Sequence, residues 1–224
     1  MRSIVLSIGG SVILSEKGEI SFLKELASLL KKISKQYKMF VIVGGGNVAR
    51  KYIKLGRDLG LDEEVLDSMG IDITRVNAKL LTNILKKSNR EIPCTLNDAN
   101  NVDKPIVVMG GTIPGHSTDM VGAELAEKIG ADLFIIATNV DGIYDKDPNK
   151  HSDAKQLKQV KIDQLIEIFG TRWTSAGKNI VIDGPALKII KRAKLTTCVV
   201  NGKRLDQLER AITCQPFDGT KIIV

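Results

Sequence analysis

The sequence predicts an α/β fold, a three-layer α-β-α sandwich around a mainly parallel β-sheet. Two features of the 224-residue chain lead to this prediction. Short apolar runs of strand length alternate with longer segments whose apolar residues recur at helical spacing. Glycine pairs or triplets follow several of the apolar runs directly, as in "IVLSIGG" and "VIVGGG". Strands and helices that alternate in this way form βαβ units, in which helices cover both faces of the sheet.

The first half of the chain contains three expected strands, at 3–8, 39–43 and 106–109. Between the first two, apolar residues at helical spacing predict a helix over 21–36, with Ser21 as its N-cap. A second helix is expected from about Asn47. Residues 62–88 are expected to be helical with an interruption near Gly70.

The second half is expected to contain strands within "DLFIIAT" and "TTCVVNG" and helices within "DMVGAELAEKIG", "KIDQLIEIFG", "DGPALKIIKRAK" and "LDQLERAI". Gly130 ends the first of these helices. Asp183 is placed to cap the third, with Pro185 in its first turn. The tail "GTKIIV" is expected to close an edge of the sheet. Since no linker, repeat or low-complexity segment divides the chain, residues 1–224 should form a single domain.

The composition narrows the classes of function. The net charge of +7 favours anionic partners such as phosphates. The basic residues do not form one block, and aromatic residues make up only 4% of the chain, so a nucleic-acid partner is not expected. The three cysteines include no C-x-x-C pair and so indicate neither a disulfide framework nor a zinc site. No apolar run reaches the length of a membrane span, and we expect a cytoplasmic protein without a membrane partner.

The glycine loops point to phosphate binding. In an open parallel sheet, ligands bind beyond the carboxyl ends of the strands, where these loops are expected to meet. Glycine lets the backbone approach a ligand closely, and the N–H groups at the start of the following helix attract phosphate. Arg50 lies about one helical turn beyond Gly46, where it is either a phosphate ligand or a solvated charge. The chain has neither G-x-G-x-x-G nor G-x-x-x-x-G-K-[ST], so no dinucleotide-binding or Walker loop is expected.

Five segments together resemble the amino acid kinase family. They are "SIGGSVI", "VIVGGGNVARKY", "LDSMGIDITRVNAKLL", "MGGTIPGHSTDMVGAELAEKIGADL" and "ATNVDGIYDKDP", and they extend in this order over nearly the whole chain. Within the family, "GGGNVARKY" and "GGTIPGHSTD" are most similar to the archaeal-type UMP kinases. The resemblance implies transfer of the γ-phosphoryl group of Mg-ATP to UMP, giving UDP and ADP in UTP and CTP biosynthesis. It also implies Mg²⁺, a homohexamer, an N-terminal acceptor-binding lobe and a C-terminal ATP-binding lobe.

The resemblance also implies a role for individual residues. Catalytic roles fall on Gly9, Gly10, Arg50 and Asp119. ATP binding falls on Gly9, Gly10, Gly46, Arg50, Thr138, Tyr144 and Asp147. UMP binding falls on Gly45, Asp67, Gly111, Thr112, Ile113, Pro114, Gly115, His116, Ser117 and Thr118. No residue is assigned as a metal ligand. Asp119 is also placed to cap the helix that follows it, and both roles are compatible.

Departures from the family pattern leave alternatives open. Many members carry a lysine two residues before the first glycine, where it contacts the transferred phosphoryl group, but this chain has Ser7. The missing positive charge must come from elsewhere: Mg²⁺, Arg50, another lysine, or Lys188, although the basic helix around Lys188 favours a solvated lysine at that position. Isopentenyl phosphate kinases begin the second glycine loop with His-Gly, and this chain has Val43 before Gly44. A kinase of that or another small phosphorylated acceptor is the first alternative. A non-catalytic nucleotide-binding protein is the second.

Overall fold

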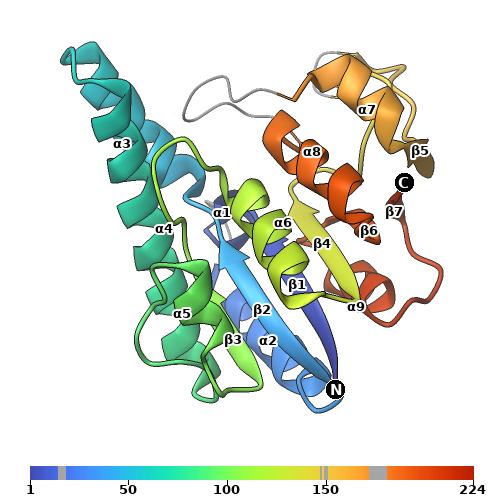
Figure 1. Cartoon of the computed structure of the whole chain (residues 1–224), viewed down its shortest axis with the longest axis horizontal. Coiled ribbons are helices and arrows are strands. Elements are labelled where there is room, and N and C mark those ends of the chain that lie inside the picture. The colour runs from blue at the N-terminus through green and yellow to red at the C-terminus, as the bar shows by residue number, and fades with distance from the viewer. Residues whose placement is uncertain (15–18, 147, 149–150, 172–180) are drawn as a thin grey trace.

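Seven strands form one sheet in a computed structural model that describes residues 1–14, 19–146, 148, 151–171 and 181–224 (Figure 1). Their order is β3-β2-β1-β4-β6-β7-β5. All neighbouring strands are parallel except β6 and β7, which are antiparallel. The strands are β1 (Arg2–Ile8), β2 (Tyr37–Val43), β3 (Ile106–Met109), β4 (Leu133–Thr138), β5 (Gln159–Lys161), β6 (Thr197–Asn201) and β7 (Gly219–Ile223). The predicted mainly parallel sheet is confirmed.

Helices cover both faces of this sheet, which confirms the three-layer sandwich (Figure 1). The helices are α1 (Gly10–Ile13), α2 (Glu19–Ile33), α3 (Gly46–Asp58), α4 (Glu63–Leu85), α5 (Leu96–Asn100), α6 (Thr118–Ile129), α7 (Ile162–Phe169), α8 (Gly184–Ala193) and α9 (Leu205–Ile212). One face is packed by α2, α4 and α9, and the other by α5, α6, α7 and α8. None of the described helices combines the length and the apolar character needed to cross a lipid bilayer.

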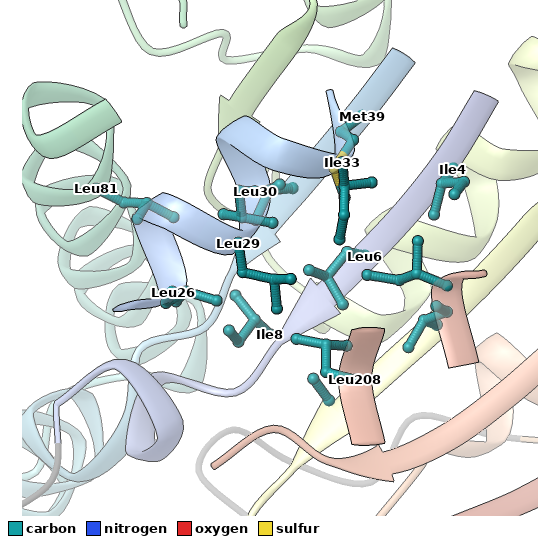
Figure 2. Packing of buried hydrophobic residues seen from close by; sticks show 14 of the residues in the cluster. Ile4, Leu6, Ile8, Leu26, Leu29, Leu30, Ile33, Met39, Leu81 and Leu208 are labelled. Atoms are coloured by element: carbon teal, nitrogen blue, oxygen red, sulfur yellow. The ribbon is translucent and has the colours of Figure 1, made fainter. Parts of the chain in front are cut away.

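The alternation of side chains along the strands divides the core into two layers. Ile4, Leu6 and Ile8 of β1 pack beneath α2 and α9, as Figure 2 shows. Val5 belongs to the layer on the opposite face, beneath α6. Ser7 follows the same alternation and is buried, so β1 directs one hydroxyl group toward α6.

Helices α3 and α4 pair at one side of the molecule, beyond β2 and β3 (Figure 1). A small apolar cluster holds them together, formed by Ala49, Ile53 and Leu66. Gly70 lies where α4 passes α3, and a Cβ atom added to it would be 3.3 Å from Ile53 Cδ1. Glycine at this position therefore leaves room for the side chain of Ile53.

The structure corrects several expectations about single elements. α4 is continuous from Glu63 to Leu85, so the interruption expected near Gly70 is wrong; that glycine marks a helix contact. α2 begins at Glu19, which places Ser21 inside the helix rather than at its N-cap. β7 lies between β6 and β5, so the tail does not form the edge. The short elements β5, α1 and α5 were not predicted, because three to five residues are too few to show a periodic pattern.

Candidate active site

Loops from four neighbouring strands meet at one edge of the sheet. β1, β2, β3 and β4 are parallel, so the loops that follow them all lie beyond the carboxyl ends. Backbone hydrogen bonds join these loops: Gly44 N donates to Ile8 O and Gly9 N donates to Ala137 O, each at 2.9 Å. The glycine loops that the sequence indicated are therefore neighbours in the folded chain.

The first and second glycine loops touch backbone to backbone. A Cβ atom added to Gly46 would lie 2.5 Å from Gly10 C and 2.7 Å from Ser11 N. One added to Gly10 would lie 2.5 Å from Gly45 C and closer still to other backbone atoms of that loop. Gly46 also has a φ of +65°, a conformation that residues with a side chain rarely adopt. Only glycine at positions 10 and 46 allows the two loops to lie this close to each other.

The N-terminus of α3 opens onto the same edge. The helix begins at Gly46, and no side chain in the described ranges accepts a hydrogen bond from its first N–H groups. Free N–H groups and the positive end of a helix dipole are suited to binding an anion. Arg50 lies one turn along the helix, partly exposed, and its Nη2 donates to Asn47 Oδ1. Its guanidinium is thus held beside Asn47, the second residue of the helix.

The third loop, residues 110–117, is fixed by side chains of α4. Thr74 Oγ1 accepts a hydrogen bond from Gly111 N at 2.7 Å. Arg75 Nη2 donates to Thr112 O at 3.0 Å, and Asp67 Oδ2 accepts from Gly115 N at 2.7 Å. Asp67 is therefore positioned against the loop with which the sequence grouped it.

Three polar residues of α4 at this site were missed by the sequence analysis. Thr74 and Arg75 hold the third loop, and Asn77 Nδ2 donates to Gly44 O of the second loop at 2.9 Å. Thr74 and Asn77 are buried on the side of α4 that faces the sheet. A polar side chain on the apolar face of an amphipathic helix needs a hydrogen-bond partner. The sequence could therefore have identified Thr74 and Asn77 as residues that contact another part of the chain.

The remaining residues of this loop lie between its tip and α6. Ile113 and Pro114 are exposed at the tip. His116 Nδ1 lies 3.2 Å from Glu124 Oε2 of α6. Ser117 is the N-cap of α6, because its Oγ accepts from Met120 N at 2.9 Å; Thr118 is the first helical residue. Asp119 is thus not the cap that its sequence position suggested.

Four residues next to this loop form what we call the acidic cluster: Ser7, Ser117, Asp119 and Asp183. Ser7 Oγ donates to Asp119 Oδ1 at 2.6 Å, which links β1 to α6. Ser117 Oγ donates to Asp183 Oδ2. Asp183 Oδ1 also accepts from Ala186 N at 2.8 Å, so the predicted N-cap of α8 is confirmed. The cluster connects one strand with the beginnings of two helices.

The carboxyl groups of the acidic cluster ionise with difficulty. Desolvation raises the pKa of Asp119 to about 6, although the hydrogen bond from Ser7 favours its charged form. Desolvation and then the charge of Asp119 raise the pKa of Asp183 to about 7, while the Ala186 N–H opposes that shift. Lys188, a candidate for the missing positive charge, is exposed on α8. The structure records no hydrogen bond or ion pair between Lys188 and the cluster within the described ranges.

The fourth loop follows β4 and contains two residues that the sequence assigned to ATP. Thr138 is the last residue of β4, and Tyr144 is partly buried six residues later. Desolvation raises the pKa of the Tyr144 hydroxyl, and the nearby charges of Asp141 and Asp218 raise it further. Asp147 lies outside the described residues.

This arrangement suits the binding of phosphate groups. The glycine loops and the start of α3 lie at one edge of the sheet, Arg50 lies on the first turns of α3, and Asp119 is linked to the end of β1 through Ser7. Fixed N–H donors and a guanidinium group are the kinds of group that stabilise the equatorial oxygens of a phosphoryl group during transfer. Within the described ranges, no three or more His, Cys, Asp or Glu side chains are grouped to hold a metal ion.

Comparisons with known proteins agree with this geometry. The model of the amino acid kinase family matches residues 2–201. A uridylate kinase of Methanobrevibacter smithii is 43% identical over 223 residues, which cover 98% of both chains. One of Methanococcus vannielii is 45% identical and covers 98% of this chain and 99% of its own.

Solved structures extend the agreement to the fold. The crystal structure of uridylate kinase from Archaeoglobus fulgidus superposes with a TM-score of 0.87 at 40% identity, covering 99% of this chain and all of that one. UMP kinase from Ureaplasma parvum has the same fold, with a TM-score of 0.80 at 23% identity. The chain belongs to the amino acid kinase family.

Proposed function

We propose that this protein is a UMP kinase, which transfers the γ-phosphoryl group of Mg-ATP to UMP and forms UDP and ADP. It would act in the cytoplasm, in pyrimidine nucleotide biosynthesis. One observation carries the proposal. Two glycine loops pack backbone to backbone, and the third loop, which α4 holds in place, lies at the same edge of the sheet. The chain that builds this edge is 43% and 45% identical to proteins named uridylate kinase.

The ATP side of the site is assigned to the first, second and fourth loops. Gly10 and Gly46, together with the start of α3, would hold the phosphates through backbone N–H groups, and Gly9, whose own N–H donates to Ala137 O, would let the phosphates approach the backbone. Arg50 would leave Asn47 and turn to the same phosphates. The adenosine is assigned to Thr138 and Tyr144, and to Asp147 from the sequence resemblance alone. The proposal keeps residues 1–224 as a single domain, with an acceptor-binding lobe toward the N-terminus and an ATP-binding lobe toward the C-terminus, and the first two glycine loops would lie between the two lobes.

The UMP side is assigned to Gly45, Asp67 and the loop from Gly111 to Thr118. Asp67 is proposed to accept hydrogen bonds from the ribose hydroxyl groups, because its Oδ2 already accepts from Gly115 N of this loop. Its second carboxylate oxygen has capacity for such a bond. The loop itself would surround the uracil and the acceptor phosphate.

The chemistry needs alignment more than acid–base catalysis. An oxygen of the UMP phosphate attacks the γ-phosphorus, and the bond from that phosphorus to the bridging oxygen breaks as ADP leaves. A phosphate monoester is already anionic, so no protein base has to remove a proton. The protein contributes by holding both phosphates in line and by presenting N–H donors to the transferred group.

A magnesium ion fits the donor chemistry of the site. Mg²⁺ prefers oxygen ligands and is usually bound by one or two carboxylates together with substrate phosphates. The carboxylate of Asp119 lies at this edge and belongs to that class of donor. When bound, the ion would neutralise phosphate charge. It would thereby supply the positive charge that many family members obtain from a lysine at the position of Ser7.

The test is ADP release from Mg-ATP with a panel of acceptors: UMP, CMP, AMP, isopentenyl phosphate and acetylglutamate. We expect turnover with UMP and little with the others, with UDP identified by chromatography. Turnover with isopentenyl phosphate instead would favour the first alternative. ATP binding without turnover on any acceptor would favour a non-catalytic protein.

We further propose a homohexamer, in which exposed apolar side chains of α3 and α4 contact other subunits. Val48, Tyr52 and Leu55 of α3 and Leu59 at its C-cap recur every three or four residues and form one exposed stripe. Leu55 and Leu59 are 58% and 70% exposed. Light scattering should give a mass about six times the 24.4 kDa of one chain. Leu55→Glu should dissociate the assembly, and a monomeric wild type would contradict the proposal.

A further inference from the structure

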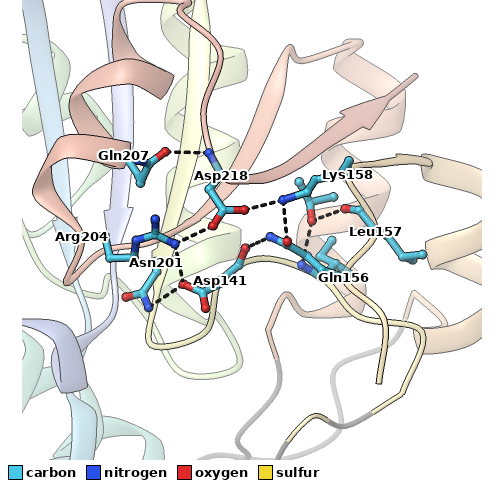
Figure 3. A network of polar contacts seen from close by, with 10 residues as sticks. Asp141, Gln156, Leu157, Lys158, Asn201, Arg204, Gln207 and Asp218 are labelled. Carbon is cyan, nitrogen blue, oxygen red and sulfur yellow. Dashed lines mark hydrogen bonds and ion pairs between the residues drawn. The ribbon is translucent and has the colours of Figure 1, made fainter. Parts of the chain in front are cut away.

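A network of charged and amide side chains surrounds the loop that follows β4 (Figure 3). The network consists of Asp141, Gln156, Lys158, Asn201, Arg204 and Asp218. β7 is antiparallel to β6, so Asp218, which directly precedes β7, lies at the same edge of the sheet as Asn201 at the end of β6. The network therefore lies on the ATP side of the proposed site.

Arg204 is at the centre of this network. Its Nη1 lies 2.5 Å from Asp218 Oδ2 and 3.4 Å from Asp141 Oδ1. Asn201 Nδ2 donates to the same Asp141 oxygen at 3.0 Å, and Lys158 Nζ donates to the other oxygen of Asp218. Asp218 thus holds two cations, which lower the pKa of its carboxyl group to about 2, Lys158 having the larger effect.

The backbone of the loop after β4 is also held by β7. Ile143 N donates to Thr220 Oγ1 at 2.8 Å, and Thr220 Oγ1 donates to Leu157 O at 2.6 Å. Gly142 has a φ of +131°, and a Cβ atom there would lie 2.6 Å from Thr220 Oγ1. Tyr144 follows directly after these contacts. Asp141 through Tyr144 therefore take their position from Asn201 of β6, from Arg204 at the N-cap of α9, and from Thr220 of β7.

We propose that Arg204 and Asp218 are positioning residues for ATP, which hold Asp141 and thereby the loop that carries Thr138 and Tyr144. This inference rests on the proposed function, because that function assigns the loop to the nucleotide. Neither residue needs to touch ATP. Their loss lowers the fraction of molecules with the loop in its binding conformation, and the apparent dissociation constant rises by the same factor.

Asp218→Asn tests the inference, because it removes the charge and keeps the size of the side chain. We expect the dissociation constant for ADP, measured by calorimetry without any acceptor, to rise about fivefold. That is the scale expected for losing partly exposed ion pairs. KM for ATP should rise similarly, while KM for UMP stays within about twofold. Asp218→Glu, which restores the charge, should recover most of the affinity. If Asp218→Asn does not fold, Arg204→Gln serves the same test.

Glu209→Gln is the matched control. Glu209 lies on α9, the helix that follows Arg204. It pairs with Lys32 of α2 at 2.6 Å and makes no hydrogen bond or ion pair with the loop among the described residues. Its loss should leave ADP binding unchanged. An unchanged dissociation constant in Asp218→Asn, with or without a lower melting temperature, would overturn the inference. A wild-type protein that binds ADP but makes no UDP would refute the proposed function alone.

Discussion

Gly10→Ala tests whether the contact between the two glycine loops determines both stability and activity. The new Cβ would lie 2.5 Å from Gly45 C, whereas carbon atoms in contact prefer about 3.5–4.0 Å, so the loops must separate by about 1 Å. The obstructing atoms are backbone and cannot rotate away. Overpacking of this kind costs about 1–3 kcal/mol, which lowers Tm by about 2–12 °C for a chain of this length. Misplacing reacting groups by 1 Å reduces kcat/KM about 100-fold.

The matched control is Gly9→Ala. The nearest atom to a Cβ on Gly9 is Ala137 O at 3.5 Å, an ordinary contact, and its φ of −57° suits any residue. This variant should melt within about 1 °C of the wild type and lose activity only through crowding of the phosphates. Both variants are compared by calorimetric melting and by UMP-dependent ADP release. A Gly10→Ala protein with wild-type Tm and wild-type turnover would refute the reasoning.

Three further predictions concern acidic residues. Asp119→Asn should lower kcat about 100-fold in the steady-state assay, because it removes the charge that organises the transfer site; wild-type kinetics would refute that role. Asp67→Ala should raise KM for UMP about tenfold and lower kcat less, because Gly115 N loses its partner; an unchanged KM would exclude Asp67 from the acceptor site. Burial raises the pKa of Asp183 from 3.8 to about 7, so the folded state binds a proton that the unfolded chain releases. The free energy of unfolding should therefore fall as pH rises from about 4 to 7, and more weakly in Asp183→Asn. Urea denaturation at pH 5 and 8 measures both slopes, and identical slopes would contradict the assignment.

The sequence predicted the elements whose patterns are local. β1, β2, β3 and β4 are apolar runs. α8 has Asp183 as its N-cap and Pro185 in its first turn. α6 ends at Gly130, in the left-handed conformation that terminates helices. Such signals lie within a few residues of one another, so they can be interpreted without knowing the fold.

Features that depend on distant parts of the chain were not predictable in the same way. Gly70 looked like a helix break because its packing partner, Ile53, belongs to another helix. The glycine loops could be located from the sequence, but not the residues that hold them: Thr74 reaches Gly111 across 37 positions and Ser117 reaches Asp183 across 66. These hydrogen bonds exist only once tertiary packing has brought the elements together.

The continuity of α4 has a consequence for the geometry of the acceptor side. Asp67, Thr74 and Asn77 belong to one helix, and they contact the third loop and the second glycine loop. A helix rises 1.5 Å per residue, so the first and last of these anchors are held about 15 Å apart along its axis. The helix therefore acts as a fixed spacer between its contacts with the third loop and its contact with the second glycine loop. An insertion or deletion of one residue between Thr74 and Asn77 would turn Asn77 by about 100° around the helix axis. Asn77 would then no longer face Gly44 while Asp67 and Thr74 hold the third loop.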